Sequence, residues 1–112
     1  MTTAYIPADQ SPTRDQVNAM PGPVLVEFGT DWCGHCRALA PEVARHLAAN
    51  PQVKHVKVED GPGRPLGRSF HVRLWPNLVF MQDGAVVRQL ARPSHQQLRE
   101  AFAAVAPGTP SP

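Results

Sequence analysis

The sequence predicts one α/β domain, a three-layer α/β/α arrangement around a central mixed β-sheet. Short β-branched apolar segments alternate with helix-forming segments along most of the chain, which is the pattern of a sheet covered by helices. In a half-exposed strand, apolar and polar residues alternate. The first long apolar segment, residues 24–28, lacks this alternation, so we expect both of its faces to be covered. Near the carboxyl end, Asp83-Gly84 between two apolar runs predicts a tight antiparallel hairpin, which makes the sheet mixed.

Length and charge narrow the possible functions. The chain has 112 residues and a formal net charge of +2, so we expect one domain and, because the basic residues are scattered, no nucleic-acid partner. No apolar run approaches membrane-spanning length, and the amino terminus lacks the features of a signal peptide. We therefore expect no membrane partner. We expect the protein to be a monomer in the cytoplasm, with its thiols reduced. Residues 1–105 are predicted to form the domain and the proline-rich residues 106–112 a disordered tail.

Local signals predict the elements in order. Tyr5-Ile6 is expected to form a very short strand, and Ser11 or Thr13 to cap a short helix. After the strand 24–28, a long helix is expected over about 33–49, kinked and interrupted by Pro41. The remaining predicted elements are a strand over 53–58, a short helix over 66–72, a strand over 78–81, a returning strand over 86–90 and a last helix capped by Ser94.

The only two cysteines lie in the stretch Trp32-Cys33-Gly34-His35-Cys36, between the buried strand and the long helix. Cys33 is expected at or just before the helix N-terminus, where free N–H groups and the helix dipole stabilise a thiolate. Such a thiolate attacks disulfides, and Cys36, about one helical turn further on, can attack the resulting mixed disulfide. His35 between them can add positive charge or move protons. The stretch predicts a redox-active Cys33–Cys36 pair.

Other interpretations of the cysteine pair are weaker. A structural disulfide that closes so small a loop would constrain the unfolded chain little. A zinc site would need two further ligands, and the chain has no second cysteine pair and no spaced histidine pair. A labile soft-metal carrier with two thiolates is a third hypothesis. We expect no metal, and no cofactor other than the redox-active disulfide, since no glycine-rich nucleotide motif is present.

The buried strand, the cysteine motif and the Pro41 that follows make the chain resemble the thioredoxin family, over about residues 13–105. The segment 72–80, Val-Arg-Leu-Trp-Pro-Asn-Leu-Val-Phe, is similar to the segment that carries the family's cis-proline. The resemblance implies a thioredoxin fold. It also implies a cis bond between Trp75 and Pro76, with the Trp75 backbone free to pair with an extended substrate.

The resemblance also implies roles within the site. Cys33 would be the attacking thiol and Cys36 the resolving thiol. Glu27 stands where the family usually has an aspartate, thought to relay a proton to or from the resolving cysteine. We favour this role, because a lone acid in a buried strand is costly to ionise and such acids gather at functional sites. The alternative is an ion pair between Glu27 and a neighbouring cation, His55 or Lys57.

Three departures from the family pattern affect the expected surface. Gly29 replaces a bulky residue, commonly tryptophan, so the surface beside the motif is expected to be more open. Trp75 replaces a smaller aliphatic residue and either offers apolar area to a partner or covers the gap left by Gly29. Gly34-His35 is the dipeptide of protein disulfide isomerases and is expected to make the disulfide more oxidising. The expected substrate-binding residues are Trp32, Gly34, His35, Trp75 and Pro76.

The leading prediction is an enzyme, a protein thiol–disulfide oxidoreductase that acts on disulfide-containing proteins. A separate reductase or oxidant must reset the pair. The cytoplasmic setting favours disulfide reduction, whereas Gly34-His35 favours oxidation or isomerisation, and reduction is preferred. The alternative is a thioredoxin-like binding module or folding helper for one partner, for which Gly29, Trp75 and the proline-rich tail would provide a specialised surface.

Overall fold

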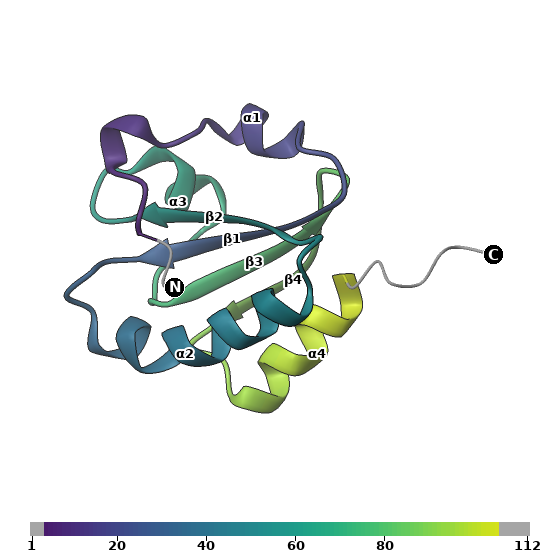
Figure 1. The fold of residues 1–112 in the computed structure, drawn as a ribbon. Coiled ribbons are helices and arrows are strands. Elements are labelled where there is room, and N and C mark those ends of the chain that lie inside the picture. The colour runs from purple at the N-terminus through teal and green to yellow at the C-terminus, as the bar shows by residue number, and fades with distance from the viewer. Residues whose placement is uncertain (1–3, 106–112) are drawn as a thin grey trace.

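A computed structural model describes residues 4–105 of the chain, and within this range the sheet has four strands. Their order across the sheet is β2 (Lys54–Glu59), β1 (Pro23–Gly29), β3 (Asn77–Gln82) and β4 (Ala85–Ala91). β1 pairs with β2 in parallel and with β3 in antiparallel fashion, and β4 returns antiparallel to β3 (Figure 1). The predicted mixed sheet is confirmed. The predicted tail, residues 106–112, lies outside the described residues.

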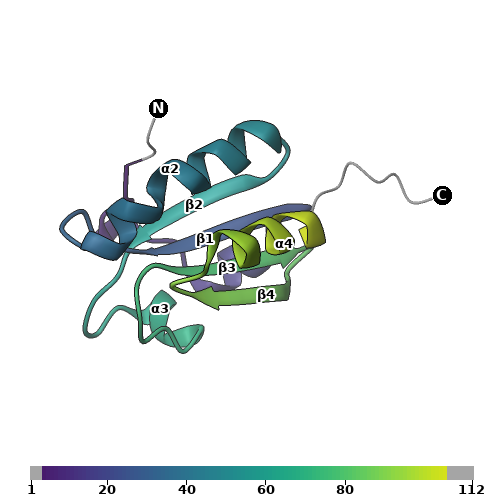
Figure 2. The same cartoon turned by 90° about the horizontal axis from the view of Figure 1, so that it is seen from below.

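Helices cover both faces of the sheet, as the predicted three-layer α/β/α arrangement requires. α1 (Arg14–Asn18) and α3 (Pro65–Ser69) pack on one face, and α2 (Gly34–Ala49) and α4 (His95–Val105) on the other. Figure 2 shows the second face, with α2 and α4 across the strands. The sequence did not predict the short 3-10 helix Ala8–Gln10 before α1. Among the described helices, none is long and apolar enough to span a membrane.

Each face of the sheet has its own apolar core. Because side chains alternate across a strand, β1 directs Phe28 toward α1 and α3 and Leu25 toward α2 and α4. In the first core the ring centroids of Phe28 and Phe70 lie 5.8 Å apart. By the same alternation Glu27 shares the face of Leu25, so the one acid of this strand lies between the sheet and α2.

Reciprocal hydrogen bonds fix the starts of α1 and α4. The Thr13 hydroxyl accepts from the Gln16 N–H at 3.1 Å, and the Gln16 side chain accepts from the Thr13 N–H at 2.9 Å. Ser94 and Gln97 make the same pair of bonds, at 3.1 and 2.8 Å. Each pair is a capping box, which satisfies N–H groups that the helix leaves free. The predicted Ser94 cap is confirmed, and at α1 the cap is Thr13 rather than Ser11.

Two helices differ from their predicted extents. α2 is one continuous helix although Pro41 lies inside it, so the predicted interruption is wrong. Leu39 and Val43 are buried on either side of this proline, and their packing outweighs the single backbone hydrogen bond that proline removes. α3 is shorter than the predicted range 66–72, because His71 has a φ of 58° and this left-handed conformation ends the helix.

The predicted short strand at Tyr5-Ile6 is a single bridge. Ile6 pairs in parallel with Val58, its N–H donates to the Lys57 carbonyl at 2.7 Å, and its carbonyl accepts from the Glu59 N–H at 3.0 Å. Ile6 packs against the core under α1 and α3. Alternation therefore turns Tyr5 toward the opposite face, where α2 lies.

Thr13→Ala is expected to lower the free energy of unfolding by about 1 kcal/mol, because the capping box of α1 is lost. Ser11→Ala is the matched control, since the Ser11 hydroxyl donates to the carbonyl of its neighbour Pro12 at 3.3 Å and does not cap α1. Urea unfolding of both variants measures the difference. Equal stabilities would show that the Thr13 cap contributes nothing.

Candidate active site

The two cysteines lie at the start of α2, directly after the loop that follows β1. Cys33 is the N-cap residue, and its sulfur accepts a hydrogen bond from the Cys36 N–H at 3.2 Å. This donor and the positive end of the helix dipole both stabilise a thiolate on Cys33. Both thiols are free, with 7% of Cys33 and 3% of Cys36 exposed. The predicted place of Cys33 at the helix N-terminus is confirmed.

Cys36 is the more buried thiol and holds its proton tightly. Burial raises the pKa of the Cys36 thiol to about 11, and the neighbouring Cys33 sulfur adds to the rise. A backbone hydrogen bond from Thr30 and the hydroxyl of Tyr5 lower the pKa and so oppose this effect. Cys36 is therefore protonated at neutral pH. It must lose its proton before it can attack a disulfide, because the thiolate is the nucleophile.

The side chain of Tyr5 fills the space beside Gly29. A Cβ on Gly29 would lie 2.6 Å from the Cys36 sulfur and 2.7 Å from the Tyr5 hydroxyl, closer than real Cβ atoms approach such neighbours. The expectation that Gly29 leaves this surface open is therefore wrong. Tyr5 was not among the predicted site residues. The signal that could have found it is Gly29 itself, because a close-packed interior fills the volume that a missing side chain leaves.

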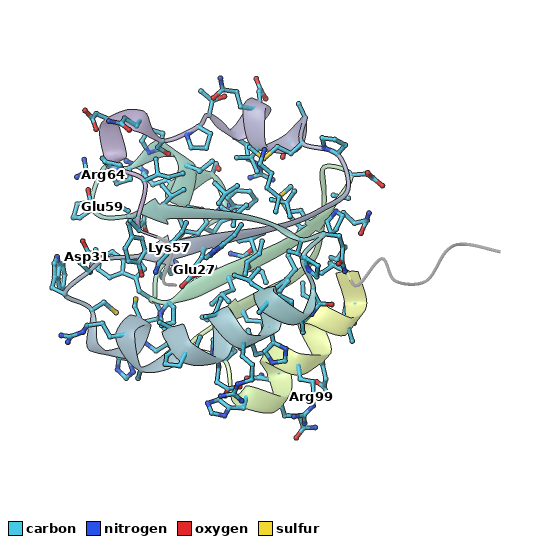
Figure 3. The ribbon with its side chains drawn as sticks, in the orientation of Figure 1. Glu27, Asp31, Lys57, Glu59, Arg64 and Arg99 are labelled. Carbon is cyan, nitrogen blue, oxygen red and sulfur yellow. The ribbon has the colours of Figure 1, made fainter. Side chains whose placement is uncertain are left out.

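Glu27 is paired with His55 on the face of the sheet that α2 covers. Its side chain is 2% exposed, and its Oε1 lies 2.7 Å from His55 Nε2. Lys57 is opposite Glu27 in the β1–β2 register, but its Nζ lies over the Tyr5 ring, 4.3 Å from the centroid. Figure 3 shows Glu27 and Lys57 in the interior of the molecule. Of the two cations considered for Glu27 the partner is His55, and the relay role of Glu27 stays a prediction.

Trp32 and Trp75 form an apolar rim beside the cysteine motif. Their rings meet edge to face with centroids 5.7 Å apart, and 76% of Trp32 is exposed. The indole N–H of Trp75 donates to Oδ2 of the buried Asp60 at 2.9 Å, which fixes the orientation of the ring. The peptide bond between Trp75 and Pro76 is cis, as expected. Trp75 thus belongs to the rim, and it does not fill the space beside Gly29.

A shallow cleft lies next to Pro76, between the start of α2 and the β4–α4 turn. It has a volume of about 200 Å³, and its walls include His35, Arg92 and His95. The Arg92 Nε donates to the Trp75 carbonyl at 2.7 Å. That carbonyl therefore already accepts one hydrogen bond, so this part of the Trp75 backbone is less free than had been expected.

The predicted site residues gather where β1 ends. α2 begins there with Cys33 at its cap and Gly34 and His35 in its first turn. Pro76 lies directly before β3, whose first residue, Asn77, is opposite Phe28 in the sheet register. Within residues 4–105, no group of three or more His, Cys, Asp or Glu side chains could hold a metal ion. The arrangement of two thiols at a helix start is suited to thiol–disulfide exchange.

A central mixed sheet with helices on both faces and a dithiol at the start of the helix after β1 defines the class of thioredoxin-fold dithiol proteins. The chain belongs to the thioredoxin family, since the family model Thioredoxin matches residues 6–104. Among solved structures, thioredoxin 2 from Pseudomonas aeruginosa PAO1 in its reduced form is similar to it. The TM-score is 0.82 and the identity 50%, over 97% of this chain and 100% of that one.

Two curated relatives match shorter parts of the chain. Thioredoxin-2 of Pyricularia oryzae is 31% identical over 86 residues, which is 77% of this chain and 50% of that protein. Protein disulfide-isomerase A2 of Pongo abelii is 46% identical over 65 residues, which is 54% of this chain and 12% of that protein. The chain therefore spans half or less of the length of these relatives.

Gly29→Ala is expected to lower the free energy of unfolding by roughly 1–3 kcal/mol, because the added Cβ overlaps the Cys36 sulfur and the Tyr5 hydroxyl. Gly34→Ala is the matched control, since a Cβ there meets nothing within 4 Å. Urea unfolding of the reduced variants measures both. A Gly29→Ala protein as stable as the Gly34→Ala protein would contradict the close packing around Gly29.

Proposed function

We propose that this protein is a thiol–disulfide oxidoreductase that exchanges the Cys33–Cys36 dithiol with disulfides of protein substrates, mainly as a disulfide reductase. The observation that carries the proposal is the Cys36 N–H, 3.2 Å from the Cys33 sulfur at the start of α2. It stabilises the nucleophilic thiolate at Cys33 and leaves the more buried Cys36 as the resolving thiol. Membership of the thioredoxin family supports the same assignment.

The proposed reaction has two exchange steps. The Cys33 thiolate attacks one sulfur of the substrate disulfide, so that a Cys33–substrate bond forms and the other substrate sulfur leaves with the electron pair. The Cys36 thiolate then attacks the Cys33 sulfur, which closes the Cys33–Cys36 disulfide and releases the second substrate sulfur. The released thiolates take up protons. The substrate is thereby reduced to a dithiol and the protein pair oxidised to a disulfide.

The rim and the neighbouring cleft form the proposed substrate-binding surface. Trp32 and Trp75 offer apolar area beside the cysteines, and His35 and Pro76 line the cleft. An extended peptide lying along the cleft would pass the Arg92 side chain, which holds the Trp75 carbonyl. Substrate selection would then depend on apolar contact with the rim and on polar contact in the cleft.

The proposed partners follow from this chemistry. The substrates are disulfide-containing proteins, and a separate reductase returns the oxidised pair to the dithiol. The disulfide is itself the redox group, so the reaction requires no further cofactor. We propose that the protein works as a monomer in the cytoplasm, where reducing systems keep such thiols in the dithiol form.

Disulfide formation or isomerisation is the second candidate, and one observation favours it. His35 is exposed in the first turn of α2, next to the cysteine whose thiolate is stabilised. A positive charge at this end of the helix adds to that stabilisation and so favours the reduced form. A pair with a more stable reduced form is a stronger oxidant.

The redox potential of the Cys33–Cys36 pair, measured by equilibration against glutathione buffers, is expected to be more reducing than that of the glutathione couple. A more oxidising value would favour oxidation or isomerisation.

Cys33→Ser is expected to abolish reduction of a protein disulfide, whereas Cys36→Ser is expected to accumulate a mixed disulfide with that substrate. A pair with no reversible dithiol–disulfide transition would overturn the enzyme proposal and leave a binding module.

Glu27 is proposed to relay a proton to or from Cys36, and Glu27→Gln tests this role. Turnover of a protein disulfide is expected to slow on the order of tenfold near neutral pH, less than for an acid or base in direct contact with the reacting atoms. The difference should shrink at higher pH, where Cys36 ionises unaided. Urea unfolding is the control, because the change also alters the pair with His55. Equal rates at every pH would dismiss the relay.

A further inference from the structure

We propose that the Tyr5 hydroxyl is the hydrogen-bond donor that stabilises the Cys36 thiolate while the mixed disulfide is resolved. The inference rests on the proposed function, because it concerns the second step of the exchange. It adds a side chain from the amino-terminal segment, far from the cysteine motif in sequence, to the groups that act on the reacting sulfurs.

The position of the hydroxyl follows from the glycine beside it. The Cys36 sulfur and the Tyr5 hydroxyl lie 2.6 and 2.7 Å from the same point, the place that a Cβ on Gly29 would occupy. Both atoms therefore pack against one small residue, and a larger side chain would separate them. The absence of a side chain at Gly29 is what lets a hydroxyl lie next to this sulfur.

Contacts with β2 hold Tyr5 in place at both its backbone and its ring. Ile6, the next residue, bonds the Lys57 carbonyl through its N–H at 2.7 Å. The ammonium group of Lys57 lies 4.3 Å from the centre of the Tyr5 ring, within the range of a cation–π interaction. Because its backbone and ring both have such contacts, the hydroxyl stays beside the sulfur and needs little reordering when the thiolate forms.

The hydroxyl acts as a neutral donor and not as a base. Burial, chiefly, and then the charges of Cys36 and Glu27 raise the pKa of Tyr5 above its ordinary value. The phenol therefore keeps its proton at any pH at which the exchange runs. Its effect on Cys36 is to lower the pKa of that thiol against the rise that burial causes.

The resolving step balances without further reactants. Cys36 releases its proton, and its thiolate accepts a hydrogen bond from the Tyr5 hydroxyl, which stays protonated. The thiolate attacks the Cys33 sulfur, the Cys33–Cys36 bond forms, and the Cys33–substrate bond breaks. The electron pair leaves on the substrate sulfur, which takes up a proton.

The charged and titratable groups around the hydroxyl are Cys33 and Cys36 from the start of α2, Glu27 from β1, and His55 and Lys57 from β2.

Tyr5→Phe tests the donor alone, because it removes the hydroxyl and keeps the ring against Lys57. Reduced protein mixed with dithiobis(nitrobenzoate) releases one coloured thiolate when Cys33 attacks and a second when Cys36 resolves the mixed disulfide. A rise of one unit in the Cys36 pKa lowers its thiolate fraction about tenfold, and the greater nucleophilicity of the more basic thiolate restores about threefold. We expect the second release to slow about threefold relative to the first, with a pH profile moved to higher pH.

Alkylation of Cys36 by iodoacetamide in the Cys33→Ser background is a readout that does not depend on catalysis. Tyr5→Phe is expected to move the midpoint of the pH dependence of alkylation upward by about one unit, because one hydrogen bond to a charged sulfur is lost. Ser11→Ala, which loses a hydroxyl from the same amino-terminal segment, is the control and should leave the midpoint in place. Urea unfolding confirms that each variant is folded.

The outcomes separate this inference from the proposed function. A second release and an alkylation profile that Tyr5→Phe leaves unchanged would overturn the role of Tyr5 and leave the oxidoreductase proposal standing. An unaltered protein that shows no second release would contradict the oxidoreductase proposal itself, and with it any role of Tyr5 in the exchange. A shifted profile together with a slowed second release supports both.

Discussion

The site depends on the unsatisfied N–H groups at the start of α2, one of which donates to the Cys33 sulfur. For that sulfur to lie there, the chain must leave the sheet at Gly29 and begin a helix at Gly34. The helix must also stay in one orientation over the sheet, which the burial of Leu39 and Val43 against it ensures. The contacts that stabilise the fold therefore also aim the backbone donors at the nucleophile.

Near the end of β1, the otherwise apolar layer between the sheet and α2 contains two buried charged side chains, Glu27 and Lys57, and each has a partner. Buried polar groups are costly unless they have partners. Glu27 has His55, and the buried Lys57 has the face of the Tyr5 ring. Gly29, which has no side chain, makes room for this arrangement, since it admits a ring that comes from another segment and carries a hydroxyl. The glycine that was expected to leave the surface open instead admits a hydroxyl beside Cys36.

Local signals were sufficient for the order of the elements and for the cysteine pair, because caps, strand patterns and the Cys-x-x-Cys spacing act within a few residues. They fail where a contact joins distant segments. Tyr5 beside Cys36, Asp60 on the Trp75 indole and Arg92 on the Trp75 carbonyl have no sequence period or spacing that predicts them. The same limit explains why α2 continues where local propensity predicts a break, since tertiary packing outweighs propensity.

In the proposed exchange, the groups around Cys33 act on its direction, and the groups around Cys36 act on its rate. Stabilising a thiolate on Cys33 lowers the free energy of the dithiol form, so in the proposed exchange the helix terminus acts on the redox equilibrium. Cys36, with a pKa of about 11, is protonated in that form at neutral pH. A donor to its thiolate therefore acts only while the exchange proceeds. Tyr5 can speed the resolving step without making the protein a stronger oxidant, so fast reduction is chemically compatible with an isomerase-like Gly34-His35 dipeptide.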